Sequence, residues 1–268
     1  MEMVLKVDYI SDLHMGFIIG NKRTNHAKVI ASINGFVDST IPEDKGDVLV
    51  IAGDVDEYNN NIVYTLNRYA EYYEKIFFVF GNHDLYLMSR KQQQKYGGDS
   101  RNRQEELKRT INEYPALRSI VTVLDNKVVE YKGYKIAGSM LWYTHPLTFD
   151  KMWWAMNSND SRKILPRGEE ASEERHQVDM EFYRSLEDKE IDLLITHVPP
   201  VHLNDIHKPS ASYYNVAISE LGLYAKHWIC GHQHTRKVKK VGDTIIYINA
   251  SGYVGELVGE PKIKQMQI

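Results

Sequence analysis

The sequence predicts an α/β protein whose core contains a parallel sheet. Three short apolar stretches, residues 4–10, 47–52 and 76–80, have the length and the β-branched or aromatic content of buried strands. Amphipathic segments with helical spacing, residues 24–37 and 60–73, separate them. Such β-α-β-α-β connections are almost always right-handed and place consecutive strands side by side and parallel.

Each of these three strands is followed at once by side chains that can bind a metal ion or transfer a proton. They are Asp12 and His14 after the first strand, Gly53 and Asp54 after the second, and Gly81, Asn82, His83 and Asp84 after the third. In an extended segment, residues two apart point to the same side, so Asp12 and His14 can converge. Because ligand sites form at the carboxyl ends of strands in open α/β sheets, we expect the three groups to meet at one edge.

A polar segment, residues 85–117, is expected to be helical. Within it, residues 90–109 carry seven basic and three acidic side chains, a net charge of +4. A solvated helix face is the simpler interpretation. The alternative is a basic rim that attracts phosphate, because the segment begins directly after Asp84.

Residues 142–167 form an aromatic segment without a regular period. They contain Trp142, Trp153 and Trp154, three of the four tryptophans of the chain. A loop of this length is often a lid or a wall of a substrate site. Packing of the tryptophans in the core is an equally good interpretation.

The remaining secondary structure follows from short-range patterns. Three short strands are predicted over residues 120–141 and a hairpin over residues 235–252. A charged helix is predicted over residues 169–186, with Val178, Phe182 and Leu186 on its buried face.

Two later strands end in histidine. Residues 191–196 and 226–230 are short apolar runs. They are followed by His197 and by Gly231, His232 and His234, respectively. We expect the glycine to permit a tight turn. A lone histidine after a strand is usually structural, whereas three of them at strand ends favour a ligand site.

The composition is that of a globular chain. The 268 residues are 43% hydrophobic and 26% charged, and because no linker or repeat interrupts them we expect one domain over residues 1–268. The net charge of −3 gives no global field that attracts nucleic acid. The single cysteine, Cys230, excludes an intramolecular disulfide. With no signal-like N-terminus and no apolar run of ~18 residues, we expect a cytoplasmic protein without a membrane partner.

The collected strand-end side chains suit divalent metal ions. Imidazoles combined with carboxylate and amide oxygens are ligands for Mn, Fe, Zn or Ni. Seven candidate ligands are too many for one ion but fit two ions that share a carboxylate, an arrangement typical of phosphoryl transfer. The seven are Asp12, His14, Asp54, Asn82, His197, His232 and His234.

The ordered series of these blocks resembles the calcineurin-like metallophosphoesterase family, in its bacterial and phage-type branch. The blocks are Asp12-x-His14, Gly53-Asp54, Gly81-Asn82-His83-Asp84, His197 and Gly231-His232-x-His234. They span residues 12–234, nearly the whole chain. The resemblance implies a four-layer α-β-β-α sandwich in which two mixed sheets are flanked by helices.

The resemblance also implies a role for each residue. One ion would be held by Asp12, His14 and His234 and the other by Asn82, His197 and His232, with Asp54 bridging them. A hydroxide between the metals would attack phosphorus. His83 would protonate the leaving oxygen, and Asp84 would orient His83.

We therefore expect a metal-dependent phosphoesterase. A nucleotide or nucleic-acid diester is the preferred substrate, because aromatic side chains over residues 142–154 could stack a base and residues 90–109 could guide a phosphate backbone. A phosphomonoesterase or protein phosphatase is the alternative within the enzyme class, and a non-catalytic metal-binding scaffold is the alternative outside it. No obligate protein partner is inferred.

Overall fold

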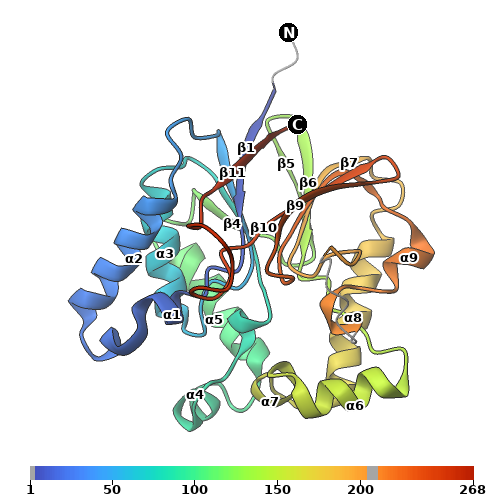
Figure 1. Ribbon diagram of the computed structural model, residues 1–268, viewed down its shortest axis with the longest axis horizontal. Coiled ribbons are helices and arrows are strands. Elements are labelled where there is room, and N and C mark those ends of the chain that lie inside the picture. Colours follow the sequence, from blue (N-terminus) through green and yellow to red (C-terminus); the bar gives the residue numbers. More distant parts are fainter. Residues whose placement is uncertain (1–3, 204–210) are drawn as a thin grey trace.

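The computed structural model describes residues 4–203 and 211–268, which form two β-sheets and the helices around them (Figure 1). The first sheet has the strand order β11-β1-β2-β3-β4, in which β1 to β4 are parallel and β11 is antiparallel to β1. Its strands are β1 (Lys6–Ile10), β2 (Val48–Ala52), β3 (Ile76–Val79), β4 (Val121–Val123) and β11 (Lys264–Gln267). All residues of β2 and β3 are buried, as parallel strands covered on both faces require.

The second sheet has the strand order β5-β6-β7-β8-β10-β9. Its four central strands, β6, β7, β8 and β10, are parallel, and the edge strands β5 and β9 are antiparallel to their neighbours. The strands are β5 (Lys127–Tyr131), β6 (Tyr134–Ser139), β7 (Ile191–Thr196), β8 (Ala225–Cys230), β9 (Arg236–Val241) and β10 (Thr244–Asn249). Both sheets are therefore mixed.

Helices cover the outer face of each sheet. In Figure 1, α2, α3 and α5 lie beside the first sheet and α8 and α9 beside the second, whereas α4, α6 and α7 lie together at one end of the molecule. The helices are α1 (Met15–Ile19), α2 (His26–Thr40), α3 (Asn59–Ala70), α4 (Arg90–Lys95), α5 (Ser100–Glu113), α6 (Thr148–Asn157), α7 (Asp160–Lys163), α8 (Glu169–Arg184) and α9 (Ile218–Leu221), with 3₁₀ turns at Gly20–Thr24, His83–Leu85 and Ala211–Tyr213. Within the described ranges, no helix combines the length and apolar character that a membrane crossing needs.

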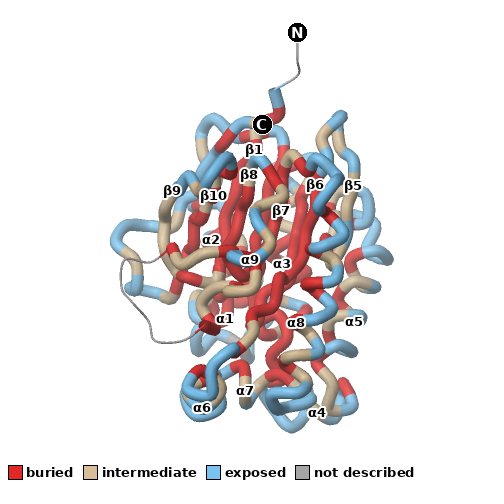
Figure 2. The backbone as a smooth tube through the Cα atoms, turned by 90° about the vertical axis from the view of Figure 1, so that its right-hand side faces the viewer, coloured by how far each residue is buried: buried red, intermediate tan, exposed pale blue. Residues whose placement is uncertain are grey.

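Side chains of the first sheet alternate between two cores. Val50 of β2 packs with Ile195 of β7 in the core between the sheets, while its neighbours Leu49 and Ile51 pack with Leu66 of α3. Figure 2 shows buried strands at the centre of the molecule and exposed positions on the outer helices. The order helix, sheet, sheet, helix confirms the predicted four-layer sandwich.

The segment expected to be an aromatic loop is helical instead. Residues 142–167 contain α6 and α7. The helical period is hidden in the sequence because α6 exposes apolar side chains: Phe149, Met152 and Met156 are 59%, 58% and 69% exposed. Apolar spacing therefore does not mark a single buried face of this helix.

The buried face of α8 also differs from the prediction. Leu186 is buried and Phe182 is partly buried, as predicted. Val178, however, is 52% exposed, and the buried face also carries the polar residues His176 and Asp179. Both contact the backbone of Trp142: His176 Nδ1 lies 2.8 Å from its carbonyl oxygen, and Asp179 Oδ2 accepts from its N–H at 2.7 Å. The assignment of Val178 was wrong because it assumed that apolar residues mark the buried side.

Candidate active site

The predicted ligand residues meet between the two sheets, in the loops that follow β1, β2, β3, β7 and β8. Five of them have a left-handed backbone, with φ of 54° at Asp12, 44° at His14, 58° at Asp54, 68° at His232 and 36° at His234. Residues other than glycine rarely adopt this conformation, which costs about 1–3 kcal/mol each. Such a concentration of strained residues is typical of a functional site.

Glycines allow these loops to approach closely. A Cβ atom at Gly81 would lie 2.2 Å from Asp54 Oδ1, and one at Gly231 would lie 2.7 Å from the Ala52 carbonyl oxygen and 2.9 Å from Asp12 Oδ2. Gly231 is not among the residues with positive φ. The Gln233 N–H donates to the Gly231 carbonyl oxygen at 2.8 Å, so the expected tight turn is present, and close packing is what requires glycine here.

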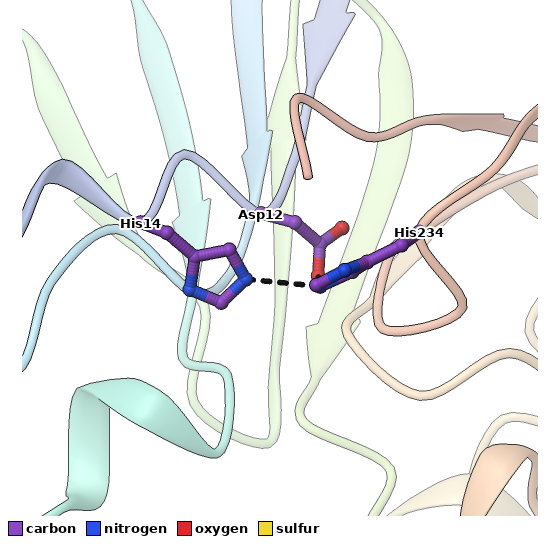
Figure 3. A group of neighbouring side chains, drawn as sticks. All are labelled: Asp12, His14 and His234. Carbon is purple, nitrogen blue, oxygen red and sulfur yellow. Dashed lines mark hydrogen bonds and ion pairs between the residues drawn. The ribbon is translucent and has the colours of Figure 1, made fainter. Parts of the chain in front are cut away.

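The first group of donors contains Asp12, His14 and His234, which point toward one another (Figure 3). His14 Nε2 and His234 Nε2 are 2.9 Å apart, and Asp12 Oδ1 is 3.5 Å from His234 Nε2. His234 Nδ1 contacts Glu256 Oε2 at 2.6 Å, and such a carboxylate orients a histidine in many metal sites. Although burial opposes it, the Asp12 and Glu256 carboxylates raise the pKa of His234 to about 9, so a metal ion must displace a proton there.

The second group contains Asn82, His197 and His232. Asn82 Oδ1 is 2.9 Å from His197 Nε2 and 3.2 Å from His232 Nδ1. The other ring nitrogens face backbone carbonyl oxygens, His197 Nδ1 at 2.8 Å from Ala52 and His232 Nε2 at 2.7 Å from Ser212, so they donate. The nitrogens that face Asn82 therefore carry lone pairs, and burial lowers the pKa of His197 to about 3. Three acceptors directed at one another fit a cation between them.

Asp54 lies between the two groups. Its Oδ2 is 3.9 Å from His14 Nε2 and its Oδ1 is 3.5 Å from His197 Nε2. Burial, together with the charges of Asp12 and Asp84, raises the pKa of Asp54 well above its usual range. A buried cluster of carboxylates is stabilised by bound cations. The donor set therefore fits two divalent metal ions.

His83 lies at the same site but contacts a carboxylate that the sequence analysis missed. His83 Nδ1 is 3.0 Å from Glu57 Oε1, and His83 Nε2 is 3.3 Å from the Tyr253 hydroxyl. His83 and Glu57 are 7% and 5% exposed. The signal in the sequence was an acidic residue three positions after Asp54, in the same loop.

Asp84, which was expected to orient His83, has another role. Its carboxylate accepts backbone N–H groups from Gly81 at 2.8 Å and from Asp54 and Val55, both at 2.9 Å. It therefore ties the loop after β2 to the loop after β3. The prediction that Asp84 orients the imidazole was wrong, because its oxygens are already used by backbone donors.

Arg103 of α5 donates hydrogen bonds to the backbone of the loops that follow β2 and β3. It is fully buried and donates to the carbonyl oxygens of His83 at 3.1 Å, Tyr86 at 2.8 Å and Asp56 at 2.8 Å. Several other basic residues of the segment 90–109 are engaged in ion pairs. These pairs are Lys95–Glu106, Arg101–Asp99 and Lys108–Asp125.

A cavity of about 230 Å³ opens beside the two groups of donors. Trp153 lines it, whereas Trp142 and Trp154 are 1% and 5% exposed and belong to the core, so residues 142–167 are partly wall and partly core. Among the described residues, the lining contains no lysine or arginine. Beyond the donors themselves it consists of His83, Tyr86, Trp153, Asn157, Ser158, Asn159, Asp160, Ser212, Tyr213, Gln233, Tyr253 and Glu256.

The two packed sheets and the donors at their strand ends define an α/β protein with a candidate site for divalent metal ions. The model of the calcineurin-like phosphoesterase family matches residues 5–236, and the chain belongs to this family. It is therefore a metal-dependent enzyme that hydrolyses phosphoesters.

Several solved structures resemble the chain, and one of them superposes well enough to show the same fold. The phosphopantetheinyl hydrolase of Mycobacterium tuberculosis is 19% identical and superposes with a TM-score of 0.69 over 97% of this chain and 95% of that chain. A calcineurin-like phosphoesterase, YfkN of Bacillus subtilis, is 11% identical, with a TM-score of 0.39 over 98% of this chain and 90% of that chain. An archaeal phosphodiesterase is 16% identical, with a TM-score of 0.36 over 98% and 99%. No curated protein sequence matched the chain.

Proposed function

We propose that this hydrolase is a phosphodiesterase that acts on a nucleotide or nucleic-acid diester. One divalent ion would be held by Asp12, His14 and His234 and the other by Asn82, His197 and His232, with Asp54 contacting both. Mn, Fe, Zn and Ni all suit these donors. Bound there, such ions supply Lewis acidity toward the phosphoryl oxygens and lower the pKa of an attacking water molecule.

His83 is assigned the role of general acid. The Glu57 carboxylate, 3.0 Å from Nδ1, keeps a proton on that nitrogen and fixes the plane of the ring. His83 Nε2 is then directed toward the cavity, where a leaving oxygen takes up a proton as its bond to phosphorus breaks. Glu57 also stabilises the charged imidazolium before that transfer.

The charge of the cavity wall is the reason for proposing a diester rather than a monoester as the substrate. Near the donors the wall presents the carboxylates of Asp160 and Glu256, and its described part has no lysine or arginine. A phosphodiester carries one negative charge, whereas a monoester carries up to two, so this wall disfavours the monoester more. The rings of Trp153 and Tyr213, with centroids 6.4 Å apart, offer flat surfaces on which a base can stack.

The first test compares a diester with a monoester. Metal-stripped protein is refilled with Mn²⁺ and assayed with bis-p-nitrophenyl phosphate and p-nitrophenyl phosphate, with His83→Ala as the control. We expect Mn²⁺-dependent turnover that favours the diester and falls in the variant. Faster hydrolysis of the monoester would overturn the choice of a diester. No turnover of either substrate, by protein shown to bind two ions, would contradict the proposed activity.

A second panel then narrows the substrate. Cyclic nucleotides, dinucleotides and single-stranded oligonucleotides represent the proposed class. A phosphopantetheinyl ester is included because one structural neighbour is named for hydrolysing that group. Preference for the phosphopantetheinyl ester over every nucleotide would refute the nucleotide assignment while leaving the diester chemistry intact.

A further inference from the structure

We propose that Asp160 is a positioning residue that fixes the direction of the Asn82 side-chain amide and so maintains the second group of metal donors. The inference rests on the proposed function, because it concerns the ion that Asn82, His197 and His232 would hold. Asp160 begins α7, within the segment 142–167, and lies outside every block by which the sequence resembles its family.

The Asp160 carboxylate accepts hydrogen bonds from three side chains. The residue is 4% exposed. Its Oδ1 accepts from Asn82 Nδ2 at 2.8 Å and from the Tyr86 hydroxyl at 2.5 Å, and its Oδ2 accepts from the Tyr143 hydroxyl. The Tyr143 oxygen in turn accepts from Trp154 Nε1 at 3.0 Å, which leaves the Tyr143 proton directed at Asp160.

A carboxylate can only accept, and this decides which end of the Asn82 amide faces it. The atom 2.8 Å from Asp160 must be the NH₂ group, so the amide oxygen is turned toward His197 and His232. In the opposite orientation, the amide oxygen would lie against the carboxylate and the two would repel.

Without Asp160 the opposite orientation would be favoured in the metal-free protein. His197 Nε2 and His232 Nδ1 both present lone pairs toward Asn82, at 2.9 Å and 3.2 Å from its oxygen. An NH₂ group in that place would donate to these nitrogens and would block the position that a metal ion needs. Asp160 opposes this rotation, and the ordered amide then offers its oxygen to an ion without a prior rearrangement.

The geometry also connects the segment 142–167 to the metal site. The backbone N–H of Leu87, four residues after His83, donates to the Lys163 carbonyl oxygen at 2.8 Å, which fixes α7 against the loop after β3. The segment thus contributes Trp153 to the wall of the cavity and the Asp160 carboxylate that accepts a hydrogen bond from the Asn82 amide.

The test measures Mn²⁺ binding by metal-stripped protein. Elemental analysis counts the bound metal. The exchange-coupled electron paramagnetic resonance spectrum detects the pair of ions. Three variants are compared with the wild type. Asp160→Leu removes the acceptor. Asp160→Asn keeps an oxygen that can accept from Asn82. Asp150→Leu removes another buried carboxylate of the same segment and is the matched control.

We expect Asp160→Leu to bind one Mn²⁺ tightly and the second about 10–100-fold more weakly, with loss of the coupled spectrum. Asp160→Asn should retain both ions within about threefold of the wild-type affinity, because a neutral acceptor still orders the amide. Asp150→Leu should leave both affinities and the spectrum unchanged.

Two wild-type-like ions in Asp160→Leu would overturn the inference. Equal loss in Asp160→Asn and Asp160→Leu would also overturn it, since charge rather than amide direction would then matter. Fewer than two ions in the wild type would instead refute the proposed dinuclear site, so the two failures are distinguishable.

A further variant covers the case in which Asp160→Leu does not fold. Tyr143→Phe removes one donor to Asp160 without touching Asn82, and we expect a loss of about 3–10-fold in the affinity for the second ion only. An unchanged second affinity in Tyr143→Phe, when the circular dichroism spectrum is wild-type, would count against the role of Asp160.

Discussion

Replacing Glu57 by glutamine tests whether this carboxylate acts through His83. The substitution keeps the size of the side chain and leaves an oxygen that can accept from His83 Nδ1, so the ring should remain in place. What is lost is the negative charge beside the imidazolium. We therefore expect kcat to fall while KM and the number of bound metal ions stay the same.

The size of the expected fall in kcat follows from the hydrogen bond between His83 and Glu57. Both side chains are buried and the Nδ1–Oε1 distance is 3.0 Å, so solvent screens the pair weakly. A hydrogen bond to a charged group contributes about 1.5–3 kcal/mol and a neutral one about 1 kcal/mol. The difference of about 0.5–2 kcal/mol corresponds to a fall in kcat of about 2–30-fold. Loss of the acid itself in His83→Ala should cost about 10²–10⁴-fold.

The assay uses two diesters that differ in leaving group, diphenyl phosphate and bis-p-nitrophenyl phosphate. The poorer phenol leaving group needs the proton more, so both variants should be more impaired with diphenyl phosphate. The double variant Glu57→Gln with His83→Ala should be no slower than His83→Ala alone. If the two effects multiply instead, Glu57 acts independently of His83 and the reasoning is refuted.

Three further predictions concern the metal site, the wall and the core. Asp54→Asn should lower the occupancy of both ions together, as counted by elemental analysis, and loss of one ion alone would argue against a shared ligand. Trp153→Ala should raise KM for a nucleotide diester with little change in thermal stability, whereas Trp154→Ala should destabilise the fold by about 3–5 kcal/mol in urea unfolding. The reverse pattern would show that the two rings have been misassigned. Burial raises the pKa of Asp179 from 3.8 to about 6, so its ionised form destabilises the folded state and stability is lost as the pH rises from about 4 to about 6. Asp179→Asn should therefore be more stable than the wild type at pH 7 by up to ~3 kcal/mol, as measured by urea unfolding. At pH 4 this difference should be absent. A difference that does not change with pH would contradict the raised pKa of Asp179.

The strands and their terminal side chains could be predicted because the signals are local. Asp54 follows an apolar strand and a glycine within two residues, and Asn82 repeats the pattern. Parallel packing of β1, β2 and β3 then brings these residues together without any further information. The His83 N–H, in the loop after β3, donates to Asp54 Oδ1 at 2.7 Å, which agrees with that expectation.

The residues that the sequence did not predict depend on long-range packing or on the direction of a loop. Asp160 contacts Asn82 across 78 positions, from a helix whose period is hidden. Trp153 and Trp154 are adjacent in the sequence, but neighbours in a helix point about 100° apart, so one lines the cavity and the other enters the core. Glu57 reaches His83 only because of the direction that its loop takes after Asp54.

Residues outside the cavity are needed to hold the strained backbone of the donors in place. Left-handed backbone at five candidate ligands costs several kcal/mol in sum. This backbone conformation cannot be predicted from the pattern of side chains in the sequence. The fold offsets this cost with backbone contacts: Asp84 accepts N–H groups from two loops, and Arg103 donates to the carbonyl oxygens of His83 and Tyr86. Gly231 leaves no room for a Cβ between Ala52 and Asp12. A chain with every donor intact but with alanine at Gly231 would therefore lose the geometry that the donors need.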